Sequence, residues 1–181
     1  REILLTENED QRLEAFHEYL KGGEGMKRFL RVFPVVATTC ISAHRLGKPE
    51  AYFDMTVMDE ASQCNTAVGL VPVLRGKNLM LVGDPQQLNP VILLDEVTNQ
   101  RLRKKYGVSE EYDYRKNSLY KSFLACDSVS DEVLLRYHYR CNRKIINFNN
   151  QKYYNSRLLI RTESEQLQPL VYVNVEDGRT D

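Results

Sequence analysis

Two short apolar segments of the sequence end in acidic residues, and this feature restricts the possible fold more than any other. Residues 52–61 (YFDMTVMDEA) contain Asp59 and Glu60 near their end, and residues 79–83 (LMLVG) lead directly into Asp84. Both segments have the length and the apolar composition of a buried strand. In an open parallel sheet, ligands bind at the carboxyl ends of the strands. The pattern therefore predicts an α/β fold with a polar site where these two strands end.

Strand-like and helix-like patterns alternate along the rest of the chain, as they do around parallel sheets. Further strands are expected in three segments, which are residues 33–42, 133–140 and 169–175. Helices are expected in five segments, which are residues 6–20, 62–74, part of 95–117, 118–125 and 142–155. The polar segment 126–132 has the composition of a linker, so we expect a second α/β unit to begin after it.

Composition narrows the class of protein without identifying its partner. Lys plus Arg and Asp plus Glu both number 25, so the net charge indicates no partner. Residues 133–162 hold seven Lys or Arg and no acidic residue, which suits either an anion-binding surface or a solvated basic face. The four cysteines form no CxxC pair, as in reduced cytosolic proteins. We see no transmembrane span and no signal peptide, so we expect a cytoplasmic location and no membrane partner.

The acidic strand ends suit chemistry on a metal-bound phosphate. In the pair Asp59-Glu60, one carboxylate can hold Mg²⁺ through water while the other orients an attacking water as general base. Asp84 lies 24 residues after Glu60, and Gln87 follows it with an amide that can bridge a phosphate and a carboxylate. The alternatives are a surface strand end for the first pair and a polar turn for the second. Two acidic strand ends in neighbouring α/β units favour one shared site.

The segment 136–140 (RYHYR) carries a second group of candidate residues. Arg140 follows the expected strand 133–140, and an arginine supplied across a cleft can neutralise charge on a transferring phosphoryl group. Tyr139, beside it, can stack on a base. The alternative is a basic strand edge with ordinary surface tyrosines.

Four segments in order resemble the superfamily 1 helicases, and they are most similar to the group of the nonsense-mediated-decay RNA helicase and its DNA-acting relatives. The segments are VVATTCISAH (35–44), VMDEASQ (57–63), LMLVGDPQQLNP (79–90) and YHYRCNRKIINFNNQKYY (137–154). The resemblance covers roughly residues 35–155. It implies two RecA-like domains of the P-loop NTPase type, with ATP and Mg²⁺ between them and single-stranded DNA or RNA across both.

The resemblance also implies roles for residues of the first domain. Asp59 resembles the Walker B aspartate that holds Mg²⁺, and Glu60 resembles the base that activates water. Gln87 matches the glutamine that senses the γ-phosphate, and Asp84 lies in the same motif and would face the bound nucleotide.

Further residues match the second domain and the nucleic-acid path. Arg140 matches the arginine finger, and Tyr139 matches the tyrosine that packs on the adenine. Thr39 and Ser42 fall where the family contacts the nucleic-acid backbone. The sequence departs from the family at Arg143, where the family usually has proline.

A Walker A motif, GxxxxGK[ST], is not present in the sequence. Residues 22–28 (GGEGMKR) have the wrong spacing. We therefore expect a truncated RecA-like parallel sheet, with the later part of a first RecA-like domain at 1–130 and the beginning of a second at 131–181. The first would include an acidic helical segment over about residues 1–30.

Three functions are compatible with this organisation. The expected one is a fragment of an ATP-dependent helicase or translocase that moves on single-stranded DNA or RNA, inactive in isolation for lack of Walker A. The alternative is a degenerate RecA-like module that binds nucleic acid or a protein without motor activity. A metal-dependent nuclease or other hydrolase would need more carboxylates and would leave Gln87 and Arg140 without a role. The sequence indicates no particular protein partner.

Overall fold

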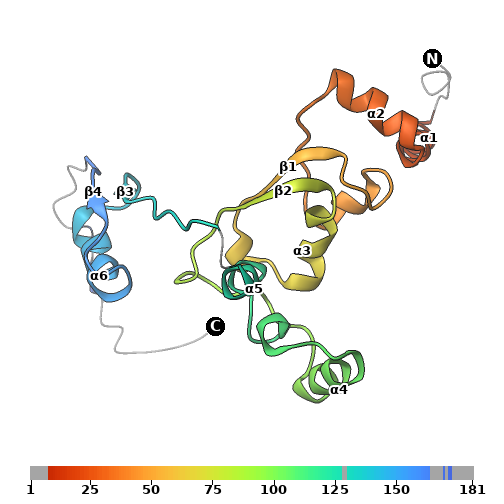
Figure 1. Cartoon of the computed structure of the whole chain (residues 1–181). Helices are drawn as coiled ribbons and strands as arrows, with labels where there is room; N and C mark the ends of the chain where they lie inside the picture. The colour runs from red at the N-terminus through yellow and green to blue at the C-terminus, as the bar shows by residue number, and fades with distance from the viewer. Residues whose placement is uncertain (1–7, 128–129, 164–168, 170, 173–181) are drawn as a thin grey trace, which may run out of the picture. The chain divides into compact units, whose positions relative to one another are not determined.

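The computed structural model describes residues 8–127, 130–163, 169 and 171–172 (Figure 1). The chain forms two compact units, residues 1–129 and 130–181, and each is described here by itself. Both units mix helices with one pair of parallel strands, so the predicted α/β class is confirmed. No helix in the described ranges is long and apolar enough to cross a membrane.

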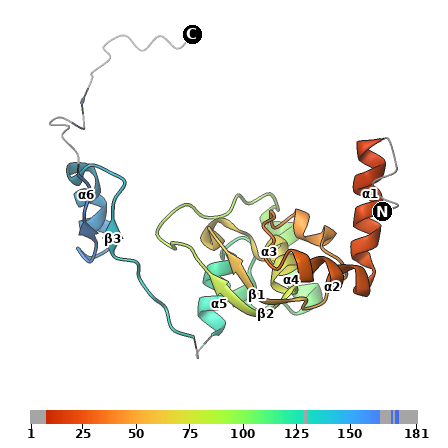
Figure 2. The same ribbon diagram turned by 90° about the horizontal axis from the view of Figure 1, so that it is seen from above.

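The first unit is built on the parallel strands β1 (Phe53–Met58) and β2 (Gly76–Leu81), which lie side by side in Figures 1 and 2. Met58 is opposite Leu81 in the register. The pairing continues beyond the strands, because Val82 N–H donates to the Met58 carbonyl and Ala61 N–H donates to the Val82 carbonyl, both at 2.8 Å. The chain segments that follow the two strands therefore leave the sheet together.

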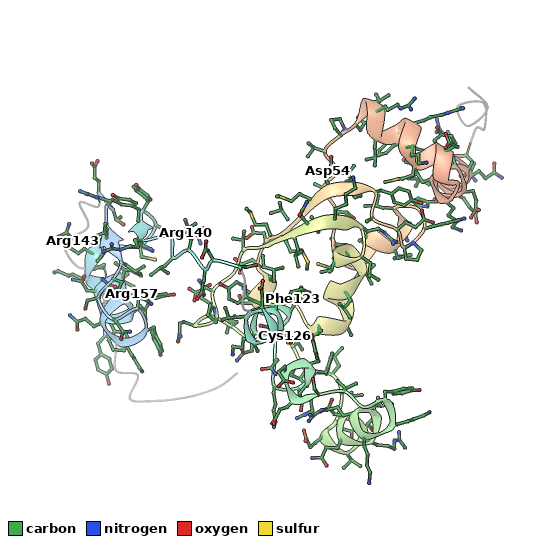
Figure 3. The ribbon with its side chains drawn as sticks, viewed as in Figure 1. Asp54, Phe123, Cys126, Arg140, Arg143 and Arg157 are labelled. Carbon is green, nitrogen blue, oxygen red and sulfur yellow. The ribbon has the colours of Figure 1, made fainter. Side chains whose placement is uncertain are left out.

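The connection between these strands is the crossover that a parallel pair requires. It consists of a 3₁₀ turn, η3 (Ala61–Gln63), and helix α3 (Thr66–Val73), which is capped by the Asn65 side chain. Helix α5 (Leu119–Cys126) packs against η3, and its residue Phe123 is labelled in Figure 3. Met58, Ala61 and Leu119 form a buried hydrophobic cluster where β1, η3 and α5 meet.

Two helices precede the sheet. Helix α1 (Glu9–Lys21) begins after Asn8, whose side chain accepts the Asp10 N–H, and helix α2 (Gly23–Val32) follows it. The Phe16 and Phe29 rings pack edge to face with their centroids 5.5 Å apart. A short 3₁₀ turn, η2 (Ser42–Arg45), leads on toward β1.

Helix α4 (Glu96–Tyr106) and the 3₁₀ turn η4 (Glu110–Tyr112) lie between β2 and α5. Helix α4 is capped by the Asp95 side chain and ends at Gly107, whose φ of 63° suits glycine at a helix C-terminus. Asp113, directly after η4, is buried and bonded to side chains of α4. These bonds hold α4 and η4 together.

The described part of the second unit repeats the strand–helix–strand order of β1, α3 and β2. Strands β3 (Tyr137–His138) and β4 (Leu159–Ile160) are parallel, and helix α6 (Arg143–Tyr153) connects them. The side chain of the buried Asn150 bonds to both the N–H and the carbonyl of Leu158, which fixes the end of α6 to the start of β4.

Several expectations from the sequence are corrected by the structure. Residues 33–39 form no strand, although they are rich in β-branched residues, and Val35 is 87% exposed. In the segment 133–140 only Tyr137 and His138 are in a strand. A β-branched or apolar run becomes a strand only where it finds a hydrogen-bonding partner, and neither run pairs along its length within the described residues.

Other expectations need smaller changes. The strand expected at 79–83 spans Gly76–Leu81, because its pairing with β1 begins at Gly76 opposite Phe53. The helix expected at 62–74 begins at Thr66, after the 3₁₀ turn. The strand expected at 169–175 lies mostly outside the described residues.

Candidate active site

The first acidic turn of the site follows β1 directly. Glu60 has a left-handed backbone with φ 52°, a conformation that is uncommon for residues other than glycine. The Asp59 side chain stabilises this turn, because its Oδ1 accepts the Glu60 N–H at 2.9 Å. Both side chains are exposed. A functional turn of this kind can retain backbone strain that an ordinary strand end would not need.

Glu60 is held by a residue that the sequence reasoning did not single out. Gln63 Nε2, at the end of η3, donates to Glu60 Oε2 at 3.0 Å. A glutamine three residues after an acid in a helical turn is the sequence signal that could have found it. The amide fixes the direction of the carboxylate and leaves its second oxygen available for a water molecule.

The second acidic turn follows β2 and is built in a similar way. Asp84 Oδ1 accepts the Gln86 N–H at 2.9 Å, and Asp84 Oδ2 accepts from Gln87 Nε2 at 3.0 Å. This is the local pairing of an aspartate with the backbone two residues ahead. Gln87 is exposed and points its amide at the same carboxylate that orders the turn.

Ser62 joins the two turns. Its Oγ accepts the Asp84 N–H at 3.1 Å, and the residue is 2% exposed. Gly83 leaves room for this approach, since a Cβ at that position would lie 2.8 Å from Ser62 N. The structure thus brings Asp59, Glu60, Asp84 and Gln87 to one edge of the sheet.

Thr39 and Ser42 belong to a turn near this edge. Thr39 Oγ1 accepts the Ser42 N–H at 3.1 Å, so the pair starts η2. Thr39 and Asp59 both line a hollow of about 450 Å³ beside β1. The threonine side chain therefore has a structural task in addition to any contact with a ligand.

The carboxylates at this edge suit a cation that takes its remaining ligands from a phosphate substrate. The described residues contain no group of three or more His, Cys, Asp or Glu side chains arranged to hold a metal. Mg²⁺ is commonly bound through one or two carboxylates together with substrate phosphates and water. The exposed Asp59 carboxylate at the strand end fits that requirement.

Arg140 and Tyr139 belong to the second unit, where they follow β3. Both are exposed, and Figure 3 labels Arg140 together with Arg143, the first residue of α6. The Tyr139 ring stacks on the Tyr137 ring with centroids 6.3 Å apart, and the Arg161 guanidinium lies 5.7 Å from the centroid of Tyr137. The end of β3 therefore presents Arg140 next to the stacked pair of Tyr137 and Tyr139.

Comparisons with known proteins show which family and relatives the chain resembles. Residues 5–95 match the model of a family described as an AAA domain. The DNA replication ATP-dependent helicase/nuclease DNA2 of Mus musculus is 32% identical over 146 residues, which are 81% of this chain and 12% of that protein. The ATP-dependent helicase MJ0104 of Methanocaldococcus jannaschii is 31% identical over 124 residues, 68% of this chain and 16% of that protein.

A third relative, the RNA helicase Mov10l1 of Mus musculus, is 34% identical over 109 residues, 56% of this chain and 8% of that protein. The chain thus spans between 8% and 16% of the length of these three relatives.

Proposed function

The chain belongs to the AAA-domain family and to the superfamily 1 helicases, and on that premise we propose that it is part of an ATP-dependent motor that moves on single-stranded nucleic acid. The observation that supports this most strongly is the pair of acidic turns at one sheet edge, joined by the bond from Asp84 N–H to Ser62 Oγ. In this proposal residues 1–130 are the later part of one RecA-like domain, and residues 131–181 begin a second.

The residues of the first unit would carry the reaction at the phosphates. Asp59 would hold Mg²⁺ together with the substrate phosphates, and the ion would neutralise their charge. Glu60 would take the proton of the attacking water, with Gln63 fixing the direction of its carboxylate. Gln87 would exchange its bond with Asp84 for one with the γ-phosphate, which links the state of the nucleotide to the turn after β2.

The second unit would supply two further residues to the reaction. Arg140 would stabilise the charge that develops on the transferring phosphoryl group. Tyr139, already stacked on Tyr137, would offer its other face to the adenine ring. Thr39, which lines the same hollow as Asp59, and Ser42, whose N–H donates to Thr39 Oγ1, would contact the nucleic-acid backbone.

The relatives do not decide between DNA and RNA, since one is a DNA replication helicase/nuclease and another is an RNA helicase. The first experiment therefore measures steady-state ATP hydrolysis by the full-length protein alone, with single-stranded DNA and with single-stranded RNA. Stimulation by one polymer identifies the strand on which the motor works.

The variant Glu60→Gln tests the assigned chemistry. Because the amide cannot accept a proton, turnover should fall at least about a hundredfold while ATP binding is retained. Asp54→Asn is the matched control: it changes an exposed acid of the same strand that pairs with Lys77 at 2.9 Å. Unchanged turnover in Glu60→Gln would remove Glu60 from the mechanism.

The alternative to a motor is a degenerate RecA-like module. A binding module without motor activity would hold nucleic acid or a protein and would not hydrolyse ATP. The same assay separates the two, because a folded full-length protein that binds a single strand but hydrolyses no ATP with either polymer is a binding module.

A further inference from the structure

The turn that carries Tyr139 and Arg140 is closed by the side chain of His138. The Cys141 N–H donates to His138 Nε2 at 2.8 Å. His138 is itself fixed in the sheet, since its carbonyl accepts the Arg161 N–H at 2.8 Å. The imidazole therefore links the end of β3 to the residue that follows Arg140.

The donor in this bond determines the role of Nε2. A backbone amide can only donate, so the bond requires Nε2 to accept with its lone pair. On the other side of the turn, Asn142 Oδ1 accepts the Lys144 N–H at 2.9 Å and starts α6. Residues 139–141 are thus held between a strand end and a capped helix.

Arg140 depends on this backbone for its direction. Within the described residues its side chain makes no hydrogen bond and no ion pair, and the residue is exposed. A catalytic arginine must reach its target within a narrow range of positions, and a displacement of about 1 Å can cost roughly a hundredfold in rate. The backbone of the turn is the part of the described structure that restricts the arginine.

We propose that His138 is a positioning residue for Arg140, acting through the hydrogen bond from Cys141 N–H to Nε2. The inference rests on the proposed function, because it needs Arg140 to meet the phosphoryl group. It adds a residue that does not touch the nucleotide and acts by fixing the turn that presents the arginine.

The test uses two variants of the full-length protein that differ only in the distance from Cα to the accepting amide oxygen. In His138→Gln the amide oxygen is the same number of bonds from Cα as Nε2, so it can accept the Cys141 N–H. In His138→Asn the oxygen is one bond closer and falls short. We expect His138→Gln to keep kcat for ATP hydrolysis within about threefold and His138→Asn to lose roughly ten- to a hundredfold.

Amide exchange at Cys141 reports the bond without reference to activity. Exchange should be slow in the unmodified protein and in His138→Gln, and fast in His138→Asn. If the two variants exchange and turn over alike, the histidine does not position the arginine and the inference is wrong.

A double variant separates this inference from the proposed function. If His138 acts through Arg140, adding His138→Asn to Arg140→Ala should cause no further loss of kcat. Independent, multiplying losses would show that His138 acts elsewhere and would overturn the inference alone. If Arg140→Ala by itself leaves turnover unchanged, the role proposed for Arg140 fails, and the inference fails with it.

Discussion

The buried carboxylate of Asp113 allows a stability prediction whose magnitude follows from its contacts. Its Oδ1 accepts from Asn99 Nδ2 and from Arg115 N, both at 2.9 Å, and its Oδ2 accepts from Arg103 Nη1 at 2.6 Å. The side chain of Asp113 is 1% exposed and that of Arg103 is 25% exposed. One carboxylate thus ties α4 to the residues that follow η4.

The variant Asp113→Asn keeps the size of the side chain and removes its charge. One of its atoms becomes an NH₂ group that faces donors, so at least one of the three bonds is lost together with the ion pair. Breaking a buried pair typically costs about 3–5 kcal/mol, and the partial exposure of Arg103 places this case at the lower end. We therefore expect the opening free energy of α4 to fall by about 3 kcal/mol.

Native-state hydrogen exchange of the α4 amides measures this quantity in place. A change of about 3 kcal/mol corresponds to roughly a hundredfold loss of protection. Asp54→Asn serves as the control, because its ion pair with Lys77 lies on the surface and should leave protection unchanged. A loss of protection in Asp113→Asn no larger than in the control would refute the reasoning.

The lowered pKa of Asp113 determines how the destabilisation by Asp113→Asn changes with pH. Burial alone would raise the pKa of Asp113, but bonds from Asn99 and the Arg115 backbone and the charges of Arg103 and Lys116 outweigh it and leave the pKa lowered. A lowered folded pKa stabilises the protein above the ordinary value of 3.8, and this stabilisation is lost as the pH falls through the folded pKa. The difference between Asp113→Asn and the unmodified protein should therefore shrink below about pH 4.

Two further predictions concern the packing beneath the site. Gly83→Ala would place a Cβ 2.8 Å from Ser62 N, so it should lower the free energy of unfolding by about 1–3 kcal/mol in thermal or urea unfolding and should also lower ATP turnover. Gly23→Ala is the control, because its Cβ would meet nothing within 4 Å. Equal behaviour of the two variants would contradict this account. Burial and the neighbouring Cys40 raise the pKa of Cys64 to about 12. At pH 8 iodoacetamide should therefore modify Cys64 much more slowly than the exposed Cys126. Equal modification rates by mass spectrometry would show that the Cys64 thiol is not shielded in this way.

The position of the acidic turns was predictable from the sequence because it depends on a general property of parallel sheets. Two apolar runs that end in acids must place those acids at one edge if the strands are parallel neighbours. Strands β1 and β2 are such neighbours, and their pairing continues as far as Val82. The roles of Glu60 and Arg140 in catalysis remain predictions.

Features that depend on a specific partner were not predictable. The run at 33–39 has a strand-like composition but no strand pairing in the structure, so local propensity alone gave the wrong element. Gln63, Ser62 and His138 matter through single hydrogen bonds whose existence depends on the path of a turn. For Gln63 the three-residue spacing from Glu60 was a signal, but no residue type or spacing marks the bonds of Ser62 and His138 in the sequence.

The partners of the carboxylates differ between the acids proposed to act in catalysis and those with a structural role. Asp113 is buried and bonded to a cationic arginine and to two neutral N–H groups, a set that a ligand could replace only by exposing the whole network. Glu60, by contrast, is exposed and accepts a bond from the neutral amide of Gln63. A water molecule or a phosphate-bound cation can compete with a neutral amide at the surface much more readily than with a buried guanidinium. The resting contacts of the site therefore favour exchange with a substrate, while those of Asp113 resist it.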